Sequence, residues 1–236
     1  MLILALDTCD SKGSVAALRG TEVLALIAHD SVEEYSSWLL RSVSELLGSV
    51  GLHLADVGVY AAAAGPGSFT GVRVALTAAK AWAEVYGRRI AVVSRLEALA
   101  SQITTSEPYV AAFADARRGQ VYGALYRQGA GKLERVGDEM VIAPEKFVAW
   151  VVEQAGTSPV RWISAEPTVL TETQAWAVRR SLGEAADLAS PIMAPMIGRI
   201  GYSLANEGRL VDALALDANY VRRSDAETTW QDRQTS

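Results

Sequence analysis

The 236-residue sequence is poor in cysteine and histidine, with one cysteine and two histidines. The single thiol, Cys9, cannot form an internal disulfide. Cys9 and the isolated His29 and His53 do not supply the clustered ligands that a zinc or iron site needs. We therefore expect a chain that folds in a reducing compartment without a disulfide or a metal centre.

A long apolar run and an excess of positive charge are also missing. No run approaches the roughly 18–20 apolar residues that cross a bilayer, and Met1 leads into the apolar segment 2–6 without a basic leader. We therefore expect a cytoplasmic protein with no membrane contact. The net charge of −5 argues against a chain that binds a phosphate backbone by itself, so any nucleic acid is expected to be reached through a partner.

Apolar side chains are abundant, at 50% of the sequence, and their spacing is typical of an α/β protein. Ser31 and Glu34 form a predicted capping box at the start of the first helix. The first half predicts an antiparallel three-stranded meander over 2–28, a helix over 32–50, a strand over 57–63, a helix over 72–86 and a strand over 90–93.

The second half begins like the first. Strand 109–114, a polar turn and strand 121–126 repeat the order of apolar strand, aspartate, turn, glycine and strand, which indicates an internal duplication. The further predicted elements are a helix after Pro144, a strand over 160–163 and helices over 171–182 and 194–206. We therefore expect an N-terminal lobe over 1–105, a smaller C-terminal lobe over 106–223 whose last helix can pack back on the first lobe, and a polar tail over 224–236.

The loop between strand 57–63 and the following helix is rich in glycine. Gly65, Gly67 and Gly71, with Ser68, would let backbone N–H groups approach a phosphate at a helix N-terminus. The loop lacks the Gly-Lys-Ser/Thr ending of a Walker loop. A tight strand-to-helix turn is therefore an equal alternative.

Two aspartates occupy equivalent places, because Asp7 and Asp115 each end an apolar strand. Facing one cleft, they could hold magnesium and position nucleotide phosphates, and Lys12 and Arg117 on the following turns could neutralise the phosphate charge. An aspartate here could equally cap its own turn, and a basic residue at a turn is often only solvated.

The first two predicted helices suggest an interface between helices. A face of small residues allows a second helix to approach closely, and tryptophan is enriched at interface hot spots, although each tryptophan could equally be ordinary core. The expected interface residues are Tyr35, Trp38 and Leu39 on the first helix and Ala75, Ala78, Ala79 and Trp82 on the second.

Four segments together resemble the TsaB (YeaZ) family. They are LALDT at 4–8, AGPGSFTGVR at 64–73, SRLEALA at 94–100 and DARRGQVY at 115–122, with a weaker match of NYVRR at 219–223. The resemblance implies an actin-like (ASKHA, ribonuclease H-like) fold of two duplicated lobes, with mixed sheets flanked by helices. The sequence departs from the family's pattern at Tyr35, where histidine is frequent, and at Arg41, where proline is frequent.

The resemblance also implies a function. Members are non-catalytic partners of the catalytic TsaD subunit in the synthesis of threonylcarbamoyladenosine in tRNA. They bind TsaD through their first two helices, help to recruit the ATPase TsaE, and form homodimers when alone. It implies no catalytic residue and no tightly bound cofactor in this chain, ATP and magnesium belonging to the assembled complex, and tRNA contact only through that complex.

A stand-alone small-molecule kinase or ATPase of the same fold is the alternative. Asp7 and Asp115 would then hold magnesium, and the loop at Gly65 would hold phosphate. The chain is short for such an enzyme, since no insertion longer than an ordinary loop is present to bind a substrate. Turnover of ATP by the isolated chain would identify this alternative.

Overall fold

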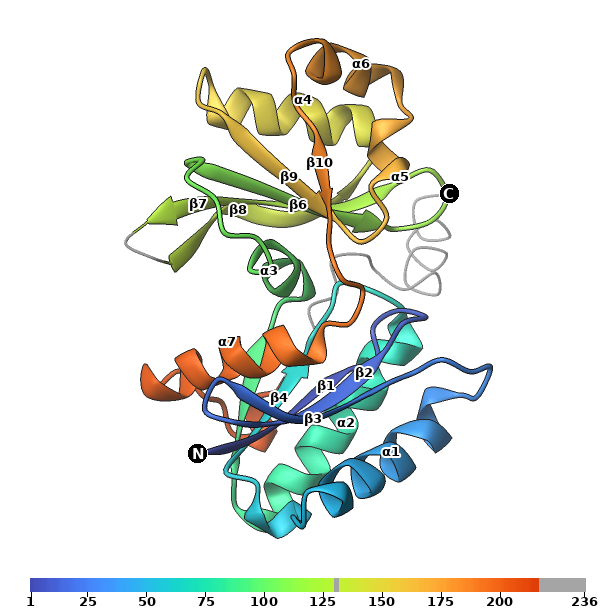
Figure 1. Ribbon diagram of the computed structural model, residues 1–236, viewed down its shortest axis with the longest axis vertical. Helices are drawn as coiled ribbons and strands as arrows, with labels where there is room; N and C mark the ends of the chain where they lie inside the picture. The colour runs from blue at the N-terminus through green and yellow to red at the C-terminus, as the bar shows by residue number, and fades with distance from the viewer. Residues whose placement is uncertain (130–131, 217–236) are drawn as a thin grey trace, which may run out of the picture.

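The computed structural model describes residues 1–129 and 132–216. The segment 219–223 and the predicted tail over 224–236 therefore lie outside the described residues. The chain forms two lobes, one above the other, each built on a five-stranded sheet (Figure 1). Within the described residues, no helix is both long enough and apolar enough to cross a membrane.

The first sheet has the strand order β3-β2-β1-β4-β5. The predicted meander is confirmed, because β2 pairs antiparallel with both β1 and β3. The other two strands run parallel to β1, with β4 directly beside it. The strands are β1 (Leu2–Asp7), β2 (Ser14–Arg19), β3 (Glu22–Ala28), β4 (Val59–Ala63) and β5 (Arg89–Val93).

The second sheet repeats this topology. Its order, β8-β7-β6-β9-β10, places an antiparallel meander beside two parallel strands in the same sequence as in the first sheet. The predicted duplication is confirmed, and the fold is the actin-like (ASKHA) fold of two related lobes. The strands are β6 (Tyr109–Asp115), β7 (Val121–Gly129), β8 (Lys132–Ile142), β9 (Val160–Ser164) and β10 (Ala186–Leu188).

Helices cover both sheets in layers. In Figure 1, α1 and α2 lie on the outer face of the first sheet, α7 and α3 lie between the lobes, and α4 and α6 cover the second sheet. The 3-10 turns η1 (Leu54–Asp56) and η2 (Ala213–Ala215) complete the first lobe. The helices are α1 (Tyr35–Ser49), α2 (Phe69–Tyr86), α3 (Arg95–Ala100), α4 (Pro144–Ala155), α5 (Thr168–Thr171), α6 (Gln174–Ser181) and α7 (Ala194–Asn206).

The last helix belongs by contact to the first lobe, where it packs on β1, β2, β4 and β5. Close approach is possible because Gly198 and Gly201 face the sheet: a Cβ at Gly201 would lie 2.7 Å from the Cβ of Ala61. The helix start is held by a buried hydrogen bond, in which the Ala194 N–H donates to Ser14 Oγ at 3.0 Å.

Two sequence predictions are corrected, and three elements are added to those predicted. The capping box is wrong, because α1 begins at Tyr35 and its N-cap, Glu34, makes no capping hydrogen bond with its side chain. Ser31 Oγ instead accepts from the Glu33 N–H at 3.2 Å, which is a local turn. The helix predicted over 171–182 is divided into α5 and α6, and α3, β8 and β10 were not predicted.

Candidate functional site

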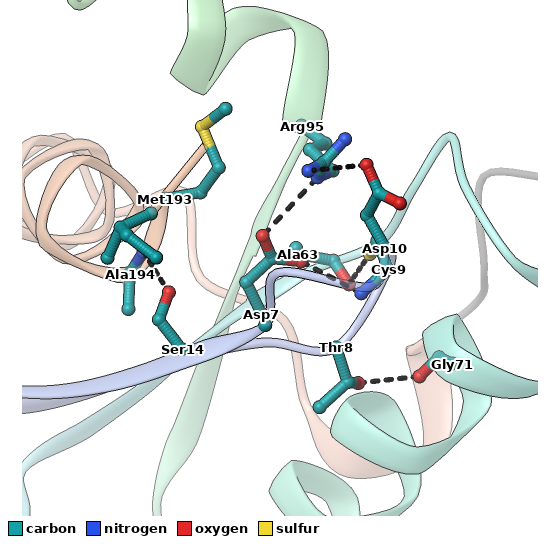
Figure 2. A network of polar contacts seen from close by, with 12 residues as sticks. Asp7, Thr8, Cys9, Asp10, Ser14, Ala63, Gly71, Arg95, Met193 and Ala194 are labelled. Atoms are coloured by element: carbon teal, nitrogen blue, oxygen red, sulfur yellow. Dashed lines mark hydrogen bonds and ion pairs between the residues drawn. The ribbon is translucent and has the colours of Figure 1, made fainter. Parts of the chain in front are cut away.

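Asp7 lies at the end of β1 with no solvent exposure, and both of its carboxylate oxygens already accept hydrogen bonds. Oδ1 accepts from the Cys9 N–H at 2.9 Å, and Oδ2 accepts from Arg95 Nε at 3.3 Å. Figure 2 shows these partners around the carboxylate. The first contact caps the turn that follows β1, and the second is a buried ion pair with Arg95.

Arg95, the first residue of α3, is the central cation of the site and was not among the predicted site residues. Its guanidinium reaches a second carboxylate, since Nη2 lies 3.3 Å from Asp10 Oδ2. Its backbone N–H donates to Gly65 O at 2.7 Å. Burial acts to lower the pKa of Arg95, but the charges of Asp7 and Asp10 prevail and raise it, so the side chain remains a fixed cation.

The glycine loop packs directly on the backbone that follows β1. A Cβ on Gly67 would lie 2.3 Å from Cys9 O, and one on Gly71 would lie 2.0 Å from Thr8 O. The Ser68 N–H donates to Cys9 O at 2.7 Å, and Ser68 Oγ caps α2 by accepting from the Gly71 N–H. Close packing of a tight strand-to-helix turn therefore explains Gly67 and Gly71.

Thr8 fixes α2 to the end of β1. Its buried hydroxyl donates to Gly71 O at 2.6 Å (Figure 2) and accepts from the Ala75 N–H at 3.2 Å. The N-terminal part of α2 is thus hydrogen-bonded to the residue that directly follows β1.

Asp115 caps its own turn, in the same way as Asp7 does. Its Oδ1 accepts from the Arg117 N–H at 2.7 Å, and its Oδ2 pairs with Arg117 Nη1 at 2.9 Å. Lys12, the other predicted cation, is exposed and lies 3.5 Å from Asp30 Oδ1. The partners of Asp7 come from the first lobe and α3, whereas those of Asp115 come from its own turn.

The predicted interface residues divide into two groups. The buried group packs inside the first lobe and is closed to a rigid partner; it consists of Trp38, Leu39, Ala75 and Ala79. The partly exposed group consists of Tyr35, Ala78 and Trp82. Trp82 also touches Tyr60, with ring centroids 5.8 Å apart.

Tyr35 has a role inside the first lobe. Its hydroxyl accepts from the Gly13 N–H at 2.7 Å and donates to Asp10 O, so it holds the β1–β2 turn that carries Asp10. Its ring packs against His29 and Trp38. Burial is the main reason that the pKa of Tyr35 is raised to about 12.

Other candidate groups carry less chemistry. Burial, and then the charge of Asp7, raise the pKa of the Cys9 thiol well above its ordinary value, which opposes a nucleophilic role. Over residues 1–129 and 132–216, no group of three or more histidine, cysteine, aspartate or glutamate side chains is arranged to hold a metal.

A cavity of about 700 Å³ lies away from Asp7, beside α7 and the β7–β8 hairpin. Its walls carry both negative and positive side chains, among them Glu97, Lys132 and Arg199. Glu207, also in the lining, forms ion pairs with Lys132 and Arg209. None of the predicted site residues lines this cavity.

Comparisons with known proteins agree with this architecture. The family model "TsaD: tRNA N6-adenosine threonylcarbamoyltransferase" matches residues 26–189. The tRNA threonylcarbamoyladenosine biosynthesis protein TsaB of Bacillus subtilis (strain 168) is 28% identical over 236 residues, covering 99% of this chain and 100% of that protein. The TsaB protein of Escherichia coli (strain K12) is 33% identical over 181 residues, covering 75% of this chain and 74% of that protein.

Solved structures give the same relationship. A Pseudomonas aeruginosa protein described as similar to the peptidase YEAZ superposes with a TM-score of 0.73 at 27% identity, covering 94% of this chain and 99% of that one. The activator of the 2-hydroxyisocaproyl-CoA dehydratase from Clostridium difficile, solved with bound ADPNP, has a TM-score of 0.50 at 13% identity, covering 89% of this chain and 97% of that one; it shows the fold alone. The matches in sequence, the duplicated lobes and the four motif segments agree, and the chain belongs to the TsaB (YeaZ) family.

Proposed function

We propose that this chain is a non-catalytic scaffold subunit in the synthesis of threonylcarbamoyladenosine in tRNA. In this proposal it binds and activates a TsaD-like catalytic subunit, helps to recruit a TsaE-like ATPase, reaches tRNA only through them, and forms a homodimer when alone. The relatives named for this pathway support the proposal.

The state of Asp7 supports a role without catalysis. A general base or a magnesium ligand needs a carboxylate oxygen that is open to the substrate or the ion. Both Asp7 oxygens face internal donors, and the side chain is fully buried. We therefore propose that this chain binds no nucleotide or metal tightly and that its contribution is a surface.

The single observation that carries the scaffold proposal is an apolar stripe along α2 that the described residues leave partly exposed. Val74, Ala78 and Trp82 are partly buried and Val85 is 73% exposed, and their spacing of four, four and three residues places them on one helical face. Leu40 adds a 58% exposed side chain on α1, which packs beside α2. A partner helix could bury this stripe while Trp38 and Leu39 stay in the core.

Copurification tests the proposal. The chain is produced together with the TsaD-like and TsaE-like proteins of its own organism, as wild type, as Val85→Glu and as Val178→Glu. Val178 is a matched control, because it is 62% exposed on α6 of the other lobe. We expect wild type and Val178→Glu to retain the TsaD-like protein and Val85→Glu to lose it, since a buried unpaired carboxylate at an interface is costly.

Light scattering on the isolated chain adds a second readout, in which Val85→Glu is expected to shift the homodimer to monomer. Failure of the wild type to retain either protein would contradict the scaffold role. Equal retention by the two variants would exclude the α2 stripe but not the role. ATP turnover by the purified chain alone would instead favour the kinase alternative.

A further inference from the structure

Two carboxylates, at the end of β1 and in the turn after it, converge on one buried cation, Arg95, at the start of α3. Asp7 Oδ2 and Asp10 Oδ2 each lie 3.3 Å from a different nitrogen of Arg95 (Figure 2). Arg95 is 5% exposed and Asp7 is fully buried, whereas the Asp10 side chain is 33% exposed. The cluster therefore has a buried end, an end that reaches water, and a guanidinium between them.

A magnesium ion would need the same space. Mg²⁺ binds through one or two carboxylates and keeps several waters, with oxygens at about 2.0–2.1 Å. Asp7 and Asp10 supply two suitable carboxylates, but both are directed at the guanidinium, and Asp10 Oδ1 also accepts from the Ser11 N–H at 2.7 Å. A magnesium ion does not fit these residues as they stand.

We propose that Arg95 is an internal substitute for a divalent cation, and that this one side chain closes a metal site formed by Asp7 and Asp10. The charge supports this assignment, since the guanidinium neutralises one of two carboxylates and its removal would leave both uncompensated. These contacts lie within the chain, so the assignment holds whether or not the chain binds the partners proposed above.

The cation is held by more than its two ion pairs. The Arg95 backbone donates to Gly65 O, and Ser94 caps the same helix by accepting from the Leu96 and Glu97 N–H groups. The guanidinium is thus built into the junction between the glycine loop and α3. Its planar fork suits two carboxylates at once, as the single ammonium of a lysine does not.

Replacing Arg95 by methionine tests the closure. The variant Arg95→Met keeps an unbranched side chain but removes the charge, and we expect it to bind Mn²⁺ about tenfold or more tightly than wild type. Electron paramagnetic resonance of free Mn²⁺ measures the affinity, and Mg²⁺ should displace the bound ion. Thermal unfolding should show Mn²⁺ stabilising Arg95→Met but not wild type.

Three further proteins make the result specific. Asp7→Asn in the Arg95→Met background removes one ligand and should abolish the gained Mn²⁺ binding. Arg95→Lys keeps a cation and should bind no better than wild type. Arg95→Gln retains a hydrogen-bond donor, so it serves in place of Arg95→Met if that variant does not fold in Mn²⁺-containing buffer.

The proposal is overturned if neither neutral variant gains Mn²⁺ affinity, or if wild type binds Mn²⁺ as tightly as they do. Restoration of their stability by acid but not by Mn²⁺ would also overturn it, because a proton would then replace the cation.

Discussion

At the residue scale, the two duplicated aspartates share one contact and differ in another. Asp7 and Asp115 both accept from the backbone N–H two residues later. Within residues 1–129 and 132–216, Asp7 also meets a cation on a distant helix, Arg95, which lies 88 residues away in the sequence, whereas Asp115 pairs with Arg117 on its own turn. The turn cap has therefore been kept in both lobes, while the surroundings of the two carboxylates have diverged.

The glycine loop gives a prediction at this scale. Gly71→Ala would place a Cβ 2.0 Å from Thr8 O, whereas Gly48, on the exposed side of α1, has nothing within 4 Å of an added Cβ. We expect Gly71→Ala to lower the free energy of unfolding by about 1–3 kcal/mol through overpacking. Gly48→Ala should raise it by about 0.5–1 kcal/mol. Urea unfolding measures both, and an equal response would contradict the packing explanation of the loop.

Tyr35 gives a second prediction. Tyr35→Phe removes the acceptor of the Gly13 N–H and the donor to Asp10 O but keeps the ring beside Trp38. We expect a loss of about 1–3 kcal/mol in the free energy of unfolding, the cost of leaving partly buried polar groups without partners. Denaturant unfolding with tryptophan fluorescence checks this value. A change below about 0.5 kcal/mol would show that water replaces the hydroxyl.

At the scale of elements, α7 packs closely on the first sheet because two of the residues that face the sheet, Gly198 and Gly201, have no side chain. Gly201 rests against β4, so Gly201→Val should force the helix outward and lower the free energy of unfolding by about 1–3 kcal/mol. Asn206→Val, at the exposed end of the same helix, should change it by less than about 0.5 kcal/mol. Thermal unfolding compares the two, and similar values would mean that α7 packs less closely than the glycine contacts indicate.

The elements also show which features a sequence reveals. The helix predicted over 194–206 matches α7 because its apolar spacing is regular and Gly208 follows it. The 11-residue β8 was missed because Gly137, with φ of +69°, and a register shift in its pairing interrupt the alternation. The duplication could have predicted both missed strands, because β8 and β10 occupy the places in the second sheet that β3 and β5 occupy in the first.

The candidate site was predicted less completely than the fold. Asp7 and Gly65 were singled out from local patterns, and both lie at the site. Asp10 and Arg95 were not, because one is an ordinary turn residue and the other the first residue of a short helix. Their contact depends on how α3 meets the end of β1, which spacing along the chain does not encode.

At the scale of the whole molecule, the lobes meet through a set of charged groups around α3. Ser94 Oγ donates to Glu139 on β8, and Lys132 at the start of β8 pairs with Glu207 beside α7. The cavity between these elements is lined by Glu97. Burial is the main cause that raises the pKa of Glu97, and the charges that face it are Arg209, Glu139, Arg135 and Glu207.

The raised pKa of Glu97 makes the free energy of unfolding depend on pH. A carboxyl with a raised pKa in the folded state binds its proton there more tightly than in the unfolded chain, so its charged form destabilises the fold. The destabilisation is absent below the ordinary value of 4.5 and develops as the pH rises through the folded-state pKa.

Glu97→Gln should therefore be more stable than wild type at about pH 7, and this advantage should shrink towards about pH 4. Glu45→Gln, at an exposed position on α1, should alter the stability little at either pH. Urea unfolding of the three proteins at both pH values measures the difference. An advantage that is constant with pH would show that the ionisation of Glu97 is not its cause, and a variant less stable than wild type at about pH 7 would show that Glu97 stabilises the junction as a charged partner of Arg209.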